Sequence, residues 1–416
     1  MRRLRIPGFL TAGLPLLLMA TLLTVAVWPV TMAWLGIPLA QGRWFADLYS
    51  LLATSDAFAL GLDPYRPNPL DPLHAPHWYT DWWFWLHDIG LTRGDASWLG
   101  LTGNLLFLAA TVVLLRPAGG GEILVGWLLV ASPAVLLGFN RANPDLVIVA
   151  LFALTAGLLA SRHRPLWLLG PPVIALLAGM KFYPLAGCAA LVFVRRPARE
   201  VIGSLAYMVA LGGLVGASVA DDFLRVAPLL EHELGVFTFG GGQLLRLLDC
   251  PPAAVAVATA SLGAVVFAGA AWRSAPAPAA FPEREVIAFV LGASVLLGCF
   301  WLGVSYLYRL AFVVLMLPLL WRWGRTAEGG ENRRWATAAL GLSLVLVWLD
   351  GLTSLALNLG WLPWPGATAA EIVRGAGWIV HGLSWGWACC LSRLLVALGH
   401  RRWQDYRADL RLTAAR

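Results

Sequence analysis

Charged side chains are scarce in this chain. Of its 416 residues only 13% are Asp, Glu, Lys or Arg, against roughly 25% in ordinary soluble domains, and 59% are hydrophobic. Lysine is almost absent, because Lys181 is the only one and the remaining basic residues are arginines. These scarcities exclude an ordinary soluble globular domain.

Several signatures of enzyme chemistry are also missing. The sequence holds no Walker A motif, no CxxC or HExxH metal motif and no Asp-x-Asp, the usual handle of metal-bound nucleotide sugars. We therefore disfavour a nucleotide-dependent or zinc enzyme and expect no cofactor and no metal-binding residues, while a divalent metal remains open. The cysteines suggest buried thiols rather than a disulfide framework, since all but Cys250 lie in apolar segments: Cys188, Cys299, Cys389 and Cys390.

Apolar runs, by contrast, recur from end to end. Runs of about 20 residues are long enough to cross about 30 Å of hydrocarbon as helices, which satisfy their own backbone hydrogen bonds. We predict an all-α polytopic transmembrane helical bundle of about 11–12 membrane segments, forming one integral membrane domain over residues 1–416. The expected segments are 7–39, 96–115, 123–137, 146–160, a hairpin over 166–194, 201–220, 253–272, 286–303, 307–321, 335–357 and a last one ending near 398.

The placement of the arginines predicts the orientation of the chain. They gather at alternate segment ends, as the positive-inside rule requires of a protein in the bacterial inner (plasma) membrane. We expect both termini on the cytoplasmic side, with a basic tail over 399–416. The net charge of +7 follows from this asymmetry and does not predict nucleic-acid binding. The arginines assigned to the cytoplasmic side include Arg162, Arg164, Arg195, Arg196, Arg199, Arg273, Arg322, Arg325 and Arg393.

Two outer loops and a short hairpin interrupt the pattern. Outer loop one, 41–95, is long enough to be functional, and its start, 45–60, has the spacing of an amphipathic helix; a second outer loop covers 221–252. The stretch 166–194 is basic on both flanks but too short for two crossings, which need about 40 residues. We predict a re-entrant hairpin broken near Lys181-Phe-Tyr-Pro184, because proline lacks the N–H of a helix interior.

Lys181 is the first candidate for function. A lysine at membrane depth needs an anion, and the phosphate of a lipid-linked substrate is one. The structural alternatives are a salt bridge to an acidic loop residue and snorkelling of the side chain to the membrane surface.

Asp47 is the candidate catalytic residue. It lies just outside the first segment, where a lipid-linked head group would be presented, and a carboxylate there can act as general base toward an acceptor hydroxyl. An ordinary solvated aspartate is the alternative reading. In the same loop Asp56, Asp63 and Asp71 compete for the role.

Two arginines at outer segment ends are candidate phosphate ligands. Arg141 and Arg309 could bind the donor phosphate, because the guanidinium fork matches phosphate oxygens, although interfacial anchoring explains them equally well. Further candidates for substrate binding or proton transfer are Asn140, Asn143, Asp145 and His232.

Four short motifs gather most of these residues. They are Asp47-Leu-Tyr49 with Gly61-Leu-Asp-Pro-Tyr65 and Asp71-Pro, Asn140-Arg-Ala-Asn-Pro-Asp145, Gly179-Met-Lys-Phe-Tyr-Pro184, and Tyr306-Leu-Tyr-Arg-Leu310. In their order and membrane sidedness they resemble the motifs of the GT-C glycosyltransferases. The resemblance is to family 87 (DUF2029-type) of that group, which includes polyprenol-phosphate-mannose-dependent mannosyltransferases.

The resemblance implies a GT-C fold and a set of roles. Asp47 matches the catalytic aspartate of the first loop, Lys181 and Arg309 would hold the donor phosphate, and Tyr183 and Tyr306 become substrate-binding candidates. The chain departs from the pattern late in outer loop one, where it has His77-Trp-Tyr-Thr80 in place of Asn-Tyr-Pro. That departure affects the region expected to shape the acceptor site.

Three functions remain as hypotheses. The first is transfer of a hexose or pentose, mannose favoured, from a polyprenyl-phosphate-sugar donor to a lipid or glycan acceptor of the cell envelope on the periplasmic face. The second is a transporter or flippase of a polar lipid, since broken helices with a charge at the break also occur in transporters. The third is a non-catalytic subunit of an envelope-assembly complex.

Overall fold

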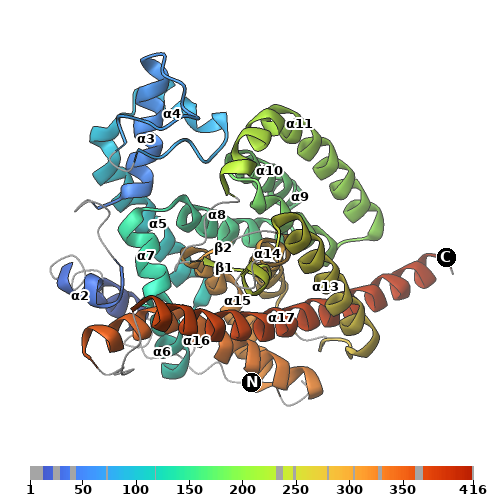
Figure 1. The fold of residues 1–416 in the computed structure, drawn as a ribbon. Helices are drawn as coiled ribbons and strands as arrows, with labels where there is room; N and C mark the ends of the chain where they lie inside the picture. Colours follow the sequence, from blue (N-terminus) through green and yellow to red (C-terminus); the bar gives the residue numbers. More distant parts are fainter. Residues whose placement is uncertain are drawn as a thin grey trace. The chain divides into compact units, whose positions relative to one another are not determined.

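The computed structural model describes residues 13–21, 29–37, 44–71, 74–117, 119–230, 238–246, 250–278, 281–302, 305–326, 330–360 and 369–414, and the structural statements below concern these residues. They are almost wholly helical, which confirms the all-α prediction (Figure 1). The α-helices are α2 (Pro29–Trp34), α3 (Ala46–Ala59), α4 (Trp85–Asp88), α5 (Ala96–Leu115), α6 (Gly120–Val130), α7 (Pro133–Arg141), α8 (Pro144–Leu159), α9 (Arg164–Leu168), α10 (Gly170–Met180), α11 (Ala198–Leu230), α12 (Gln243–Arg246), α13 (Pro252–Arg273), α14 (Glu283–Leu302), α15 (Val313–Arg325), α16 (Gly330–Asn358) and α17 (Ala369–Ala414).

Short elements of other kinds complete the chain. The 3₁₀ helices are η1 (Asp81–Phe84), η2 (Arg93–Asp95), η3 (Tyr183–Phe193) and η4 (Leu307–Phe312), and the strands β1 (Thr238–Phe239) and β2 (Ser305–Tyr306) form a two-stranded sheet.

Seven of the described helices are long and apolar enough to cross a membrane, which supports a polytopic membrane protein. The bent pair α6 and α7 raises this number to eight if it is one span. The candidate spans are Arg93–Leu115, Ala198–Val226, Ala253–Arg273, Glu283–Trp301, Leu307–Arg325, Gly330–Asn358 and Gly377–Asp409.

The described part of the chain therefore holds fewer full spans than the predicted 11–12. The expected segment 123–137 is broken, because α6 and α7 meet at 53° where Pro133 opens the second helix. Its successor α8 has 16 residues, short of a full crossing. The expected first segment, 7–39, lies partly outside the described residues.

One predicted loop is wrong in its bounds, and the predicted tail is helical. The outer loop expected over 221–252 begins later, because α11 continues through Asp221 and Asp222 to Leu230. The tail expected over 399–416 is the helical end of α17, which runs to Ala414. In both places charge suggested the end of a helix, but both helices continue, α11 through Pro228 and α17 through Gly399.

The contacts divide the chain into two compact units. Unit 1 comprises Met1–Ala150, Tyr306–Val314 and Leu344–Val380, and unit 2 comprises Leu151–Ser305, Leu315–Ser343 and His381–Arg416.

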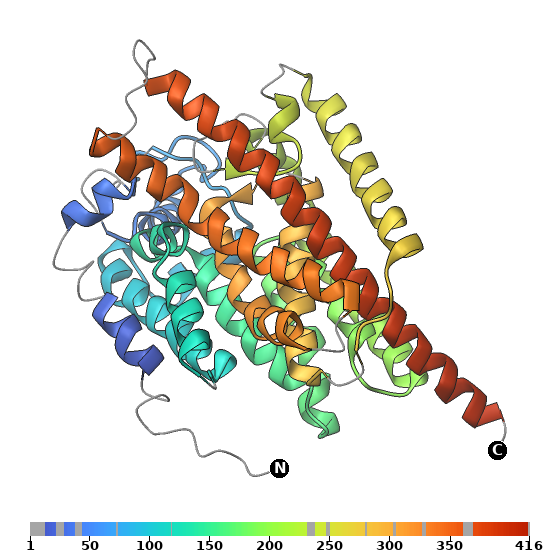
Figure 2. The same cartoon turned by 90° about the horizontal axis from the view of Figure 1, so that it is seen from below.

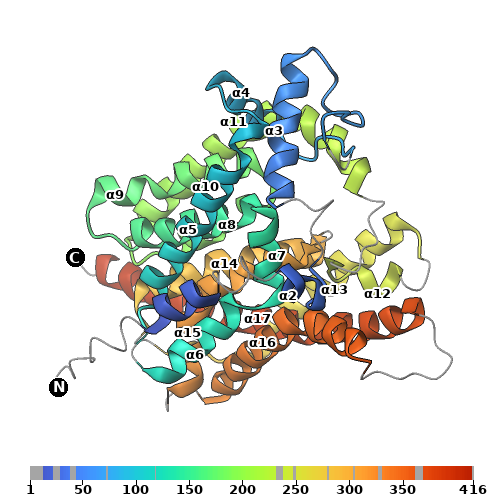
Figure 3. The same cartoon turned by 90° about the vertical axis from the view of Figure 1, so that its left-hand side faces the viewer.

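Unit 1 is built around α3, the helix predicted at the start of outer loop one. It packs on α4, η1 and η2 and on the membrane helices α5 and α7, and Figure 3 shows α3 and α4 side by side. Its Leu51 and Leu52 are fully buried. On another face of α7 lies η4, so that the segment carrying Arg309 packs against the helix carrying Asn140.

Unit 2 contains the broken hairpin. α10 ends at Met180, Lys181 has extended backbone (φ −145°, ψ 132°), and η3 begins at Tyr183. The break therefore lies where the sequence predicted it, whereas the membrane sidedness of the hairpin stays a prediction. η3 packs on α14. The unit 2 parts of α16 and α17, drawn in orange and red in Figure 2, are joined by a hydrogen bond that Trp387 Nε1–H donates to the Ser343 hydroxyl at 2.8 Å.

A close contact in unit 1 yields a stability prediction. A Cβ added at Gly351 of α16 would lie 2.1 Å from Cγ of Pro133 at the start of α7. We expect Gly351→Ala to lower the free energy of unfolding by about 1–3 kcal/mol through overpacking. Gly341→Ala in the same helix is the control, since no described heavy atom lies within 4 Å of its added Cβ. Equal unfolding midpoints of the two variants in detergent would contradict the contact.

Candidate functional site

The turn between α7 and α8 shapes the candidate site. Ala142 adopts the left-handed conformation (φ 45°), and the N–H groups of Ala142 and Asn143 donate to the carbonyls of Phe139 and Gly138 at 3.2 and 3.0 Å. This is a Schellman ending for α7. Asn143 then caps α8, because its Oδ1 accepts the N–H of Asp145 at 2.9 Å. Two helix ends thus meet within a few residues and expose several polar side chains together.

Asp47 lies in the first turn of α3, and its carboxylate is held by two residues of the α7–α8 turn. Its Oδ1 accepts from Arg141 Nη1 at 3.0 Å, and its Oδ2 accepts from Asn143 Nδ2 at 2.6 Å. The Asp47 side chain is 14% exposed. A carboxylate in the first turn is also favoured by the helix dipole. Both oxygens are therefore oriented by named donors, while a small part of the group stays accessible.

Phe45 sets the position from which α3 starts. It has positive φ (63°), and its N–H donates to the carbonyl of Asn140 at 2.6 Å. Its ring lies against Gly100 of α5, where an added Cβ would approach within 2.6 Å. The strained residue thus ties the first turn of α3 to α5 and α7.

A second ion pair lies beside the first. Arg309 of η4 pairs with Asp145 at 3.4 Å between Nε and Oδ2; the carboxylate is fully buried, and the guanidinium side chain is 11% exposed. The two pairs together hold two carboxylates and two guanidinium groups, so their formal charges cancel.

Tyrosines surround these charges. The rings of Tyr306 and Tyr308 are stacked with centroids 5.4 Å apart. The pKa of Tyr79 is raised well above its ordinary value, first by burial and then by repulsion from Asp47 and Asp145. Tyr79 therefore remains a neutral O–H donor beside the carboxylates.

The comparisons with known proteins identify no family. No family model matches the chain, and no curated protein and no solved structure matches it. A function proposed for the chain therefore rests on the arrangement of its side chains.

The structure brings together five of the ten predicted site residues. Asp47, Arg141, Asn143, Asp145 and Arg309 form one cluster in unit 1.

Three further predicted residues fall elsewhere. Lys181 and Tyr183 belong to unit 2, where Lys181 is buried and its Nζ lies 5.9 Å from the centre of the Tyr183 ring. His232 lies outside the described residues.

Asn140 has an unusual environment. Its side chain is fully buried, and neither its amide nitrogen nor its amide oxygen has a hydrogen-bond partner in the described part of the chain. An unsatisfied buried amide costs about 1–3 kcal/mol, and such groups call for an explanation such as a bound ligand.

The competing aspartates of outer loop one are engaged differently. Asp56 is paired with Arg93 at 2.6 Å, and Asp63 is half-exposed, pairs with Arg66 at 3.2 Å and accepts the N–H of Tyr65 in a turn. Their contacts are those of loop-stabilising residues. Asp71 is buried. Asp47 differs from Asp56 and Asp63 because it contacts the α7–α8 turn.

Sequence reasoning missed Tyr79 and Tyr308 as members of the site. Tyr308 lies one position before Arg309 in a motif already singled out, so the sequence could have predicted it as a site residue. Tyr79 lies in the divergent His77-Trp-Tyr-Thr80 segment, and only the fold shows its electrostatic coupling to Asp47 and Asp145.

Other catalytic centres find no support. No group of three or more His, Cys, Asp or Glu side chains suited to a metal exists among the described residues. Gly382-Leu-Ser-Trp-Gly386 has GxSxG spacing, but Ser384 is buried inside α17, whereas a hydrolase nucleophile requires a strand-to-helix turn.

The Tyr79 environment predicts a loss of stability at high pH. In the unfolded chain the phenol ionises near pH 10, whereas the folded pKa is higher, so the folded state holds the proton longer and unfolding becomes easier as pH rises above 10. We expect the free energy of unfolding of the wild type to fall by up to about 1.4 kcal/mol per pH unit more than that of Tyr79→Phe. Denaturant titrations between about pH 8 and 11 measure this, and parallel curves would refute it.

Proposed function

We propose that the chain is a glycosyltransferase that moves a sugar from a polyprenyl-phosphate donor to a hydroxyl acceptor of the cell envelope. The observation that carries the proposal is the Asp47 carboxylate, oriented by Arg141 and Asn143 and partly accessible. A fixed carboxylate beside arginines fits a reaction that needs a base for a hydroxyl and a cation for a departing phosphate.

In the proposed step, a proton and a sugar change partners. Asp47 removes the proton of the acceptor hydroxyl as its oxygen attacks the anomeric carbon of the sugar. The bond between that carbon and the phosphate oxygen breaks, and the polyprenyl phosphate leaves with the bonding electrons. When Asp47 takes the proton, its pair with Arg141 loses the negative partner. The cluster then carries one uncompensated positive charge, which stabilises the leaving phosphate.

The neighbouring residues have supporting roles in this proposal. Arg309 adds a second guanidinium and is held in place by Asp145. Tyr79 supplies a neutral hydroxyl donor, and Asn140 supplies an unsatisfied amide for the sugar or the acceptor. Lys181 remains a proposed phosphate ligand on the strength of its chemistry. The side of the membrane proposed for the reaction is the outer face of the bacterial inner membrane, with both termini cytoplasmic.

Sugar transfer by purified full-length protein tests the proposal. The protein in detergent is given radiolabelled polyprenyl-phosphate-mannose and, separately, the glucose and arabinose analogues, with envelope lipids as acceptors. We expect label to move from one of these donors to an acceptor. Absence of release from all three donors, with a protein that is folded by circular dichroism, would count against the proposal.

A substitution at Asn140 separates binding from folding. Asn140→Leu replaces two unsatisfied buried polar atoms by methyl groups, so we expect the unfolding midpoint to be unchanged or higher. If the amide binds substrate, the same variant raises KM by about tenfold, corresponding to the loss of one hydrogen bond of about 1.4 kcal/mol. Unaltered KM and reduced stability would show that Asn140 is purely structural.

The second candidate, a flippase of a polar lipid, has one observation in its favour. α6 and α7 form a broken span bent by 53°, and broken spans occur at transport sites. Counterflow of a labelled lipid in proteoliposomes without sugar transfer would favour this candidate.

A further inference from the structure

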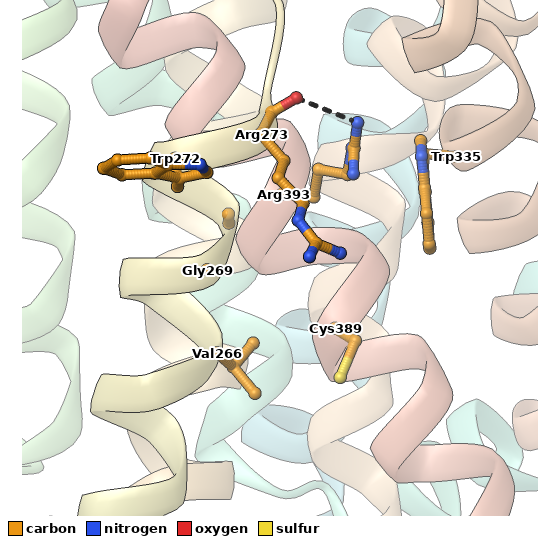
Figure 4. A pocket seen from close by; sticks show the side chains of 8 residues that line it. Val266, Gly269, Trp272, Arg273, Trp335, Cys389 and Arg393 are labelled. Atoms are coloured by element: carbon orange, nitrogen blue, oxygen red, sulfur yellow. Dashed lines mark hydrogen bonds between the residues drawn. The ribbon is translucent and has the colours of Figure 1, made fainter.

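A groove in unit 2 lies far in sequence from the Asp47 cluster. It has a volume of about 370 Å³, within the usual range of roughly 300–1,000 Å³ for ligand pockets. It lies between the last turns of α13 and the unit 2 parts of α16 and α17 (Figure 4). Its lining residues are Val266, Gly269, Ala270, Trp272, Arg273, Trp335, Cys389 and Arg393.

The groove is apolar at one end and cationic at the other. Val266, Gly269 and Ala270 belong to an apolar helix long enough to span a membrane, and Arg273 is its last residue. Trp272 is 90% exposed, a tryptophan at the end of such a helix, where membrane proteins place interfacial anchors. An amphipathic groove at this position matches the change from acyl chain to head group along a phospholipid.

Arg393 is fixed in the groove. Its Nη2 lies 2.8 Å from the Glu331 carboxylate and donates to the carbonyl of Arg273 at 3.3 Å, the bond drawn in Figure 4. Its guanidinium carbon lies 4.9 Å from the centre of the Trp335 ring. Its Nε, however, is buried and has no hydrogen-bond partner among the described residues. A buried N–H of a charged group without an acceptor is costly, and a phosphate oxygen would satisfy it.

The charges of the groove favour an anion. Arg273 and Arg393 both line the groove, whereas none of its lining residues is acidic. The carboxylate that pairs with Arg393, Glu331, is 59% exposed and therefore screened by water. Both arginines also belong to the set that the positive-inside pattern assigns to the cytoplasmic face, the leaflet surface where basic pockets between helices hold anionic lipid head groups.

We propose that this groove binds the head group of an anionic phospholipid. The phosphate lies beside Arg273 and Arg393, and an acyl chain follows Val266 to Ala270 along α13. The proposal is independent of the sugar-transfer function.

A substitution that fills the groove without altering charge provides the first test. A Cβ added at Gly269 meets no described atom within 4 Å, and Gly269 lines the groove, so Gly269→Leu places a bulky apolar side chain there. Gly216→Leu in α11 is the matched control, with the same open space outside the groove. Delipidated full-length protein is titrated in detergent with phosphatidylglycerol, phosphatidylcholine or inorganic phosphate, and bound lipid is counted by native mass spectrometry.

We expect wild type and Gly216→Leu to bind phosphatidylglycerol at least fivefold more tightly than phosphatidylcholine, and Gly269→Leu to lose this preference. Inorganic phosphate should not compete at equal concentration, because it lacks the acyl chains. Equal binding of both lipids by the wild type, or an unchanged preference in Gly269→Leu, would overturn the proposal.

A charge substitution provides the second test. Arg273→Gln should weaken phosphatidylglycerol binding about fivefold, the usual contribution of one basic residue near a membrane surface. Arg407→Gln is its matched control, since Arg407 lies on α17 outside the groove and its guanidinium carbon stacks 5.0 Å from the Trp403 ring centre. Equal affinities of the two variants would show that the groove arginine does not contact the lipid.

Discussion

Replacement of Asp47 by asparagine is expected to reduce sugar transfer by about 10²–10⁴-fold, the usual contribution of a general base. The substitution keeps the size of the side chain but removes its ability to accept the proton. It also leaves Arg141 with a neutral partner, so donor binding should persist. Single-turnover transfer of radiolabel from the donor accepted by the wild type measures the effect.

The matched control for this experiment is Asp63→Asn. Asp63 belongs to the same outer loop, is half-exposed and pairs with a neighbouring arginine, and its turn contact lies outside the Asp47 cluster. We expect this variant to retain transfer within about twofold, since exposed pairs contribute about 0–1 kcal/mol. Undiminished transfer by Asp47→Asn would show that Asp47 is not the base. Equal losses of transfer in both variants would show that the substitutions act by disturbing the fold of outer loop one.

The second large effect is expected at the buried pair. Arg309→Leu leaves the Asp145 carboxylate fully buried without its cation, which should lower the free energy of unfolding by about 3–5 kcal/mol. The double variant Arg309→Leu with Asp145→Asn should regain most of this loss, because the uncompensated charge is gone. Unfolding titrations of wild type, the two single variants and the double variant form a thermodynamic cycle.

Arg322→Leu serves as the control for that cycle. Its pair with Glu285 is short, at 2.7 Å, but half of the Arg322 side chain is exposed. We expect a loss of at most about 1 kcal/mol, typical of surface pairs. If Arg309→Leu costs no more than Arg322→Leu, then Asp145 is either protonated or hydrated in the folded protein.

Helix positions could be predicted from the sequence where apolar runs end at strong signals. α5 begins and ends as expected, at Ala96 and Leu115, and α13 differs by one residue at each end from the expected 253–272. The predictions failed where a helix continues past the membrane. α11 continues through Asp221 and Asp222, and α17 continues through its basic end. Sequence hydropathy reports the boundary of the lipid rather than the end of a helix.

The residues of the candidate site were predictable by chemistry, but their partners were not. Polar groups among apolar segments singled out Asp47, Arg141, Asn143, Asp145 and Arg309. The pairs they form join residues 94, 96 and 164 positions apart, and no local pattern encodes such contacts. The first-loop helix had to be docked on α7 before Asp47 could meet its donors.

The Asn143-Pro144 sequence affects how fast the site is damaged chemically as the protein ages. Asparagine side chains deamidate when the following backbone nitrogen attacks the amide, and proline has no N–H with which to do so. The hydrogen bond from the Asp145 N–H further fixes Oδ1, so Nδ2 must face Asp47. Deamidation would place a second carboxylate 2.6 Å from the first. The proline that opens α8 thus also protects the site from a slow, irreversible gain of negative charge.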